Sequence, residues 1–223
     1  MLNSIKKVVV VAPHPDDETL GVGGSISRLT SEGIEVHILF VGGHLPPVYN
    51  EDQYKHTHKE ALKALKILNV KSYKFLEIPA TTFNLIPINE FNFKIKSFIE
   101  DIMPEMVFLP FPDRHIDHRI VFDSTIVACR PLKKNAPKFL LCYETLSETH
   151  WNAPGIEANF TPDFFIDISL FIENKINALK CYKSQINDLG ARSIDANKAL
   201  ARFRGSQNNC EYAESFKVVR ILI

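Results

Sequence analysis

The sequence lacks an excess of either charge. Lysine and arginine together number 26, aspartate and glutamate also number 26, and the formal net charge is zero. Binding to nucleic acid or to an anionic membrane surface depends on an excess of basic residues, so this balance argues against both kinds of partner. The sequence also lacks a run of the roughly 20 apolar residues that a membrane-spanning helix requires. We therefore expect no nucleic-acid partner and no integral membrane segment.

Cysteine is scarce, with four residues in 223. The four are widely spaced and form no C-x-x-C pair, so a dense disulfide framework is not indicated. We expect reduced thiols and predict a cytoplasmic location. The N-terminal stretch MLNSIKKVVVVAP places lysines before apolar residues, as a signal peptide does. Its apolar part is too short and is followed directly by charged residues, so we interpret it as a core strand.

The sequence does contain a regular alternation of apolar runs and amphipathic segments. Short apolar runs predict strands at residues 8–12, 36–41, 73–78, 106–110, 139–143, 163–168 and 216–222. Apolar residues at helical spacing predict helices at 19–32, 57–68, 91–103, 120–129, 171–184 and 195–203. This alternation favours an α/β fold, a single-domain Rossmann-like three-layer sandwich with a mostly parallel sheet. We expect one such domain over residues 1–223, with a loop at 44–54.

Two polar clusters directly follow apolar strands. The first lies in VVVVAPHPDDETLGVGG and the second in FPDRHIDHRI. The side chains that can bind a metal or move a proton there are His14, Asp16, Asp17, Glu18, His115, Asp117 and His118. In sheets of this kind, ligands collect outside the carboxyl ends of the strands. We therefore expect both clusters to contribute to one active site at that edge.

The residue types in these clusters suit a zinc ion. Imidazole nitrogens and carboxylate oxygens are the usual zinc ligands where thiolates are absent, and a catalytic zinc keeps three protein ligands and one open position. Pro15 fixes a backbone torsion in the first cluster, so we infer that His14 and Asp17 can bind one ion while Asp16 faces elsewhere. One histidine of the second cluster would complete the set, which leaves the remaining groups free for proton transfer.

Simpler interpretations exist for each cluster taken alone. Acidic residues are favoured at a helix N-terminus, so one of the three acids in HPDDE is easily explained as a cap. Single histidines are more often surface or core residues than ligands. Two clusters in equivalent positions favour the metal site over both explanations.

The same stretches resemble a known family. VVVVAPHPDDETLGVGGSI followed by RHIDHR is similar to the zinc-dependent N-deacetylases of the PIG-L (LmbE-like) family, whose motifs are of the AHPDDE and HxDH types. The segments HTHKEALKALKILNV and RFRGSQNNCEYAESF also resemble the family, so the likeness covers nearly the whole chain. It implies a hydrolase, a deacetylase that holds one Zn²⁺ per chain.

The resemblance also implies roles for individual residues. The zinc ligands would be His14, Asp17 and His118. Asp16 would act as general base, and His115 would stabilise the oxyanion or protonate the leaving amine. Asp117 would orient a histidine from outside the ligand set. Two positions depart from the family pattern: Ile116 replaces a frequent proline, and His58 replaces an arginine that precedes the retained Glu60, so an arginine contact to substrate is not expected there.

The substrate implied by the resemblance is an N-acetylated amino sugar of the N-acetylglucosamine type, or a small-molecule or glycoconjugate derivative of one. Aromatic rings suit sugar faces and carboxylates suit hydroxyls. The candidate substrate contacts are Glu18, His58, Tyr143, Glu144, Trp151 and Arg204. For Tyr143 and Trp151 the alternative is packing beneath a loop. For Arg204 the alternative is contact with a second copy of the chain in a homo-oligomer.

Two other functions compete with a sugar deacetylase. A zinc amidase acting on a nonsugar N-acyl substrate would share every motif. A noncatalytic sugar-binding member of the family would be expected to have lost Asp16 or a metal ligand, and this sequence has kept them.

Overall fold

One sheet runs through the molecule in the computed structural model, which describes residues 5–153 and 155–223. Its strands are β1 (Lys7–Ala12), β2 (Glu35–Gly43), β3 (Ser72–Pro79), β4 (Met106–Pro110), β5 (Phe139–Tyr143), β6 (Phe164–Asp167) and β7 (Ala213–Ile221). They are ordered β3-β2-β1-β4-β5-β7-β6. β1 to β5 are parallel, and β7 pairs antiparallel with both β5 and β6. The predicted single α/β domain with a mostly parallel sheet is confirmed.

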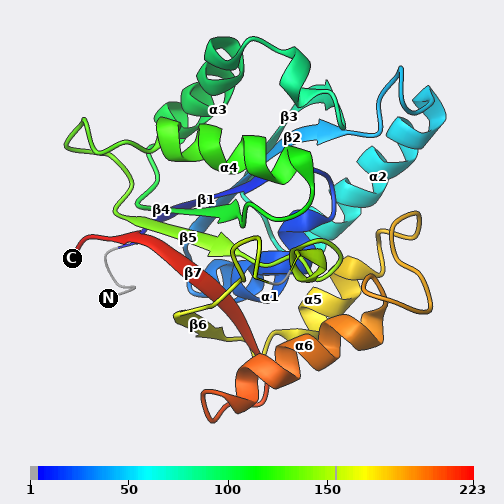
Figure 1. Cartoon of the computed structure of the whole chain (residues 1–223). Coiled ribbons are helices and arrows are strands. Elements are labelled where there is room, and N and C mark those ends of the chain that lie inside the picture. Colours follow the sequence, from blue (N-terminus) through cyan, green and yellow to red (C-terminus); the bar gives the residue numbers. More distant parts are fainter. Residues whose placement is uncertain (1–4, 154) are drawn as a thin grey trace.

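Helices cover both faces of this sheet (Figure 1). They are α1 (Asp17–Ser31), α2 (Glu51–Ile67), α3 (Ile88–Ile102), α4 (Ile116–Ala128), α5 (Ile172–Leu179) and α6 (Ile194–Ser206), with short 3-10 turns η2 (Phe83–Leu85) and η3 (Thr149–Trp151). α3 and α4 pack on one face, and α1, α2, α5 and α6 contribute to the core on the other. No helix in the described part of the chain has the length and apolar composition needed to cross a lipid bilayer.

The buried strand β1 separates the two cores. Val8, Val10 and Ala12 join the core with α1, α2 and α5. Val9 and Val11 point the other way, into the core with α3 and α4. Because helices cover both faces, every position of β1 from Val8 to Ala12 is apolar, which explains the unbroken run in the sequence.

The strand order changes direction at one point of the sheet, between the neighbouring strands β1 and β4. From β1 it moves to β2 and β3 with α1 and α2 on one face, and it then returns to the other side of β1 and places α3 and α4 on the opposite face. Ligands of open α/β sheets bind at such a switch point, outside the carboxyl ends of the strands. The two polar clusters follow β1 and β4, so the topology brings them together.

Some helix boundaries differ from the predicted ones. α2 begins at Glu51, so the loop predicted to reach residue 54 ends at Asn50. The cause is a capping box: the Asn50 side chain accepts from the Gln53 backbone N–H at 2.9 Å, and the Gln53 side chain accepts from the Asn50 N–H at 3.0 Å. α4 begins at Ile116, four residues earlier than predicted, because the His115 imidazole caps it.

Candidate active site

The first cluster forms a strained turn between β1 and α1. Asp16 occupies the N-cap position of α1 without a capping bond from its side chain, and its φ of 129° lies in a backbone region that is costly for residues other than glycine. Its backbone N–H donates to Glu18 Oε2 at 3.1 Å. The Glu18 carboxylate is fixed in turn by the hydroxyls of Thr19 and Tyr182, at 2.5 and 2.6 Å. Glu18, which was predicted as a substrate contact, has no exposed surface. Its carboxylate instead supports the turn that presents Asp16.

The three predicted metal ligands converge beyond this turn. Asp17 Oδ2 lies 3.4 Å from His14 Nδ1 and 3.4 Å from His118 Nε2. Ligand atoms bound to a tetrahedral zinc ion at 2.0–2.2 Å lie about 3.3–3.6 Å apart. The three residues form one of two His/Asp groups in the described chain that could hold a metal ion. Their chemistry and spacing therefore fit zinc.

Each of the two histidines is fixed from behind by a buried carboxylate. His14 Nε2 donates to Asp117 Oδ2 at 2.8 Å, and that oxygen also accepts from the Thr81 backbone N–H at 2.7 Å. His118 Nδ1 donates to Asp113 Oδ2 at 3.0 Å. Because the carboxylate accepts the proton of one ring nitrogen, the lone pair of the other ring nitrogen points toward the metal position. That second nitrogen is Nδ1 in His14 and Nε2 in His118.

Asp113 was missed by the sequence analysis, although it lies in the second cluster. Its Oδ2 also accepts from Thr149 Oγ1 at 2.9 Å, and its Oδ1 accepts from the His115 backbone N–H at 3.0 Å. The only signal in the sequence was that Asp113 stands five residues before the candidate ligand His118. Its pairing with His118 could not be predicted, because that pairing depends on how the chain passes from β4 into α4.

The second group that could hold a metal consists of His14, His115 and Asp117. It fits less well, because Asp117 Oδ2 is already the acceptor for His14 Nε2 and for the Thr81 N–H. In the group with Asp17, His14 offers Nδ1 instead, so the bond from its Nε2 to Asp117 is kept. The geometry therefore favours the group formed by His14, Asp17 and His118.

The charges around these ligands favour a cation. Burial alone would lower the pKa of His14, but hydrogen bonds to Asp117 and Asp17 outweigh it and raise that pKa to about 9. The pKa of His118 rises to about 10 against the same burial effect, because of Asp17 and Asp113. Although burial opposes it, the neighbouring His118 holds the pKa of Asp17 well below its usual range. Three buried acids facing two imidazoles thus create a site that attracts positive charge.

Asp16 lies beside this group and has a different environment. The residue is 2 % exposed, and its Oδ2 has no hydrogen-bond partner among the described residues. Burial raises its pKa to about 8, and the Arg192 guanidinium opposes this rise from 3.7 Å. Arg192 comes from the segment between α5 and α6 and also lies 3.5 Å from Glu148 Oε1. The sequence contained no sign that Arg192 would reach this site.

His115 borders the same space. Its ring centroid lies 4.7 Å from that of His14 and 5.1 Å from that of His118. Burial and these two neighbouring rings lower its pKa to about 4. Its Nδ1 accepts from the Asp117 backbone N–H at 3.2 Å, which leaves Nε2 as the donor of a neutral ring.

The other predicted substrate contacts are dispersed. Tyr143 is fully buried, and its hydroxyl donates to the Val11 carbonyl at 2.9 Å, so it packs the core. Glu144 and Arg204 are both buried and pair through two hydrogen bonds of 2.9 and 2.8 Å. His58 stacks on Phe75 with centroids 4.1 Å apart, and Trp151 is 68 % exposed. Tyr143, Glu144 and Arg204 thus have structural partners inside the protein.

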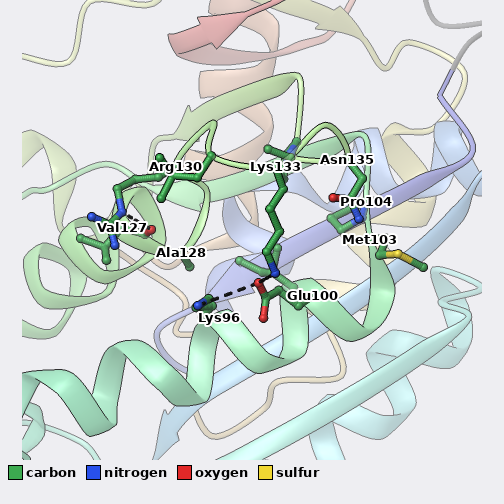
Figure 2. Close-up of a pocket in the computed structure, with 13 residues that line it drawn as sticks. Lys96, Glu100, Met103, Pro104, Val127, Ala128, Arg130, Lys133 and Asn135 are labelled. Carbon is green, nitrogen blue, oxygen red and sulfur yellow. Dashed lines mark hydrogen bonds and ion pairs between the residues drawn. The ribbon is translucent and has the colours of Figure 1, made fainter.

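A separate pocket of about 180 Å³ lies between α3 and the segment after α4 (Figure 2). Lys133 crosses it to Glu100, with Nζ 2.5 Å from Oε1. Met103 and Pro104, which line it, precede β4, so the pocket lies toward the amino ends of the strands. It contains none of the clustered histidines and is distinct from the candidate site.

Comparisons with known proteins found similar sequences and similar folds. The chain is 28% identical to the diacetylchitobiose deacetylase of Thermococcus kodakarensis over 97% of this chain and 84% of that protein. The structure of a conserved protein from Thermus thermophilus is also 28% identical, with a TM-score of 0.76 and coverage of 97% and 96%. The zinc-inhibited form of teicoplanin deacetylase Orf2 shares the fold, with a TM-score of 0.76, 18% identity, and coverage of 96% and 98%.

The family comparison covers both polar clusters. The model of the PIG-L family, described as GlcNAc-PI de-N-acetylase, matches residues 9–129, which is more than half of the chain and includes the segments that follow β1 and β4. The chain therefore belongs to the PIG-L family of deacetylases, which are hydrolases.

Proposed function

We propose that this deacetylase depends on zinc and removes the acetyl group from an N-acetylated amino sugar of the N-acetylglucosamine type, or from a conjugate of such a sugar. The observation that carries the proposal is the group of His14, Asp17 and His118, with the buried Asp16 carboxylate beside it. The 28% identical relative named as a diacetylchitobiose deacetylase supports the sugar substrate. We further propose that residues 1–223 act as one deacetylase domain.

In this proposal His14, Asp17 and His118 hold the ion. When bound there, zinc would lower the pKa of a water molecule and polarise the acetyl carbonyl. Asp117 and Asp113 keep the two imidazoles in the orientation that the ion requires, because each accepts the proton of the outer ring nitrogen.

Asp16 takes the proton of the attacking water as the water oxygen bonds to the acetyl carbon. Burial raises the pKa of Asp16 to about 8, which suits a group that accepts and then returns a proton near neutral pH. The neutral His115 ring donates from Nε2 to the oxygen that becomes negative. The bond between carbon and nitrogen then breaks, and the proton held by Asp16 passes to the amine, so that acetate and a free amino sugar leave.

Metal content and one substitution test this proposal. Purified protein should contain about one zinc per chain. Asp16→Asn should retain the zinc and lose most of the activity, because the amide cannot accept the proton. Asp123→Asn, an exposed position on α4, is the matched control and should keep both. A folded protein without bound zinc, or an Asp16→Asn variant with near-normal activity, would contradict the proposal.

A substrate panel separates the sugar deacetylase from an amidase with the same site. N-acetylated sugars and simple N-acyl amides should be compared by assaying the free amine that each releases. Release from the sugars alone supports the proposal, whereas preferential cleavage of the nonsugar amides would replace it by the amidase function.

A further inference from the structure

One cationic side chain reaches the proposed general base from a distant part of the chain. The guanidinium of Arg192 lies 3.7 Å from Asp16 Oδ2, and Arg192 is the only described residue that forms an ion pair with Asp16. Asp16 Oδ2 is buried and accepts no hydrogen bond from the described residues, and the Asp16 side chain does not cap α1. The charge of Arg192 is therefore the interaction that can fix the orientation of this carboxylate.

This ion pair differs from those on the surface of the protein. The Asp16 side chain is 3 % exposed and that of Arg192 is 31 % exposed. In the pair of Arg202 with Glu211, the two side chains are 60 % and 59 % exposed. Water screens an exposed pair, so that it contributes little, whereas a buried carboxylate interacts more strongly with a nearby charge. Arg192 can therefore act on Asp16 although the two groups lie farther apart than a hydrogen bond allows.

A chain of hydrogen bonds that begins on α2 holds the guanidinium in place. Arg192 Nη1 donates to Gln185 Oε1 at 3.1 Å, and Gln185 Nε2 donates to Ser184 Oγ at 3.0 Å. Ser184 in turn donates to the Glu60 carboxylate twice, from Oγ at 2.6 Å and from its backbone N–H at 3.0 Å. Glu60 is buried on α2. The Arg192 side chain is thus attached to a helix of the main core.

The backbone around Arg192 is held by the start of α6. Ser193 caps this helix, because its Oγ accepts from the Ala196 N–H at 3.1 Å. The buried Asn197 donates from Nδ2 to the carbonyls on either side of Arg192, at 3.4 Å to Ala191 and at 2.8 Å to Ser193. Both the backbone and the side chain of Arg192 therefore have fixed positions, as a residue that orients another group requires.

A second acid faces the guanidinium from another loop. Arg192 Nη2 lies 3.5 Å from Glu148 Oε1, and Glu148 directly precedes η3 in the chain between β5 and β6. The next residue, Thr149, donates to Asp113, so this loop is attached to the proposed metal site. In Figure 1 the segment between α5 and α6 extends to the side of the sheet at which β2 and β5 end. The terminal nitrogens of Arg192 are thus directed at protein groups.

We propose that Arg192 is a positioning residue, whose guanidinium, held by Gln185 and Glu148, keeps the Asp16 carboxylate in the orientation that proton transfer requires. The inference rests on the proposed function, since it assigns a partner to the proposed general base. General bases contribute about 100–10,000-fold to a rate, and a misplacement of about 1 Å can cost about 100-fold. Loss of Arg192 should therefore lower kcat and leave substrate binding nearly unchanged.

Kinetics with diacetylchitobiose as the probe test this role. Arg192→Ala should keep its zinc and lower kcat by about 10–100-fold, with KM within about twofold of the wild type. Arg192→Lys should recover part of the loss, and so should millimolar guanidinium chloride added to Arg192→Ala. Arg202→Ala, which removes an exposed arginine of α6, is the control and should match the wild type. A rise in KM alone, or a loss that neither lysine nor guanidinium restores, would overturn the inference.

A double variant tests whether Arg192 acts through Asp16. Removal of a positioning residue should cost nothing once the group that it positions has been replaced. Asp16→Asn combined with Arg192→Ala should therefore be as active as Asp16→Asn alone, within about twofold. A further loss of about tenfold in the double variant would show that Arg192 acts on the reaction independently, and the positioning role would be wrong.

Crystal structures separate this inference from the proposed function, because they require no turnover. The Asp16 side chain should adopt a different rotamer in Arg192→Ala than in the wild type. That change supports the role of Arg192 even if the wild type releases no acetyl group, a result that would instead contradict the deacetylation reaction. An active wild type together with an unmoved Asp16 in Arg192→Ala would leave the deacetylase intact and refute the positioning role.

Discussion

The carboxylate of Asp113 should control how tightly the site holds zinc. It accepts hydrogen bonds from His118 Nδ1, Thr149 Oγ1 and the His115 N–H, at 3.0, 2.9 and 3.0 Å. Asp113→Asn keeps the shape but turns one acceptor oxygen into a donor. Because every one of these partners is a donor, at least one hydrogen bond must be lost. His118 would then lose the anion that fixes its tautomer and orientation.

The expected size of the effect follows from this geometry. Loss of a carboxylate behind a metal-binding histidine typically weakens metal affinity by about 10–100-fold, which corresponds to about 1.4–2.8 kcal/mol. We expect that range for Asp113→Asn. Thr149→Ala removes one partner of Asp113 but leaves its charge and its bond to His118, so its effect on zinc affinity should be smaller.

Competition with a chromophoric zinc chelator measures the affinity directly. Circular dichroism should show that each variant is folded. Asp123→Asn, which changes an exposed acid on α4, is the control for loss of one negative charge. If folded Asp113→Asn binds zinc as tightly as the wild type, or if Asp123→Asn weakens zinc binding equally, the role assigned to Asp113 is wrong.

Two further predictions concern stability. In Gly21→Ala the new Cβ would overlap the buried Tyr143 ring, so overpacking should cost about 1–3 kcal/mol of folding stability and lower the Tm. In the control Gly43→Ala the nearest contact of the new Cβ is an ordinary 3.7 Å, so the Tm should change little. Equal Tm values for the two variants would contradict this prediction. For Glu144, burial raises the pKa, but hydrogen bonds from His150 and Arg204 outweigh it and keep the pKa below the ordinary 4.5. The stabilising contribution of the Glu144 carboxylate is therefore complete above pH 4.5 and is lost as the pH falls through its lowered pKa. Urea unfolding should show that Glu144→Gln destabilises the protein at pH 7 and that this destabilisation becomes smaller in acid. A destabilisation that grows in acid would contradict this prediction.

Local patterns in the sequence were sufficient for much of the fold. The run of valines in β1 predicted a strand covered on both faces, which the structure confirms, and its abrupt end in HPDDE predicted a metal-binding turn. The order of strands and helices then predicted a mostly parallel sheet with polar clusters at its carboxyl edge. These features depend on neighbouring residues and on general topological rules, so one sequence was enough.

Tertiary structure decided which side chains meet. The sequence did not show that β1 and β4 are direct neighbours, that Asp113 pairs with His118, or that Arg192 reaches Asp16. Nor could it tell that Tyr143 packs inside the core. The sequence by itself thus determined the residue types of the site, whereas their pairing depends on the packing of segments far apart in the chain, for which no local pattern carries the information.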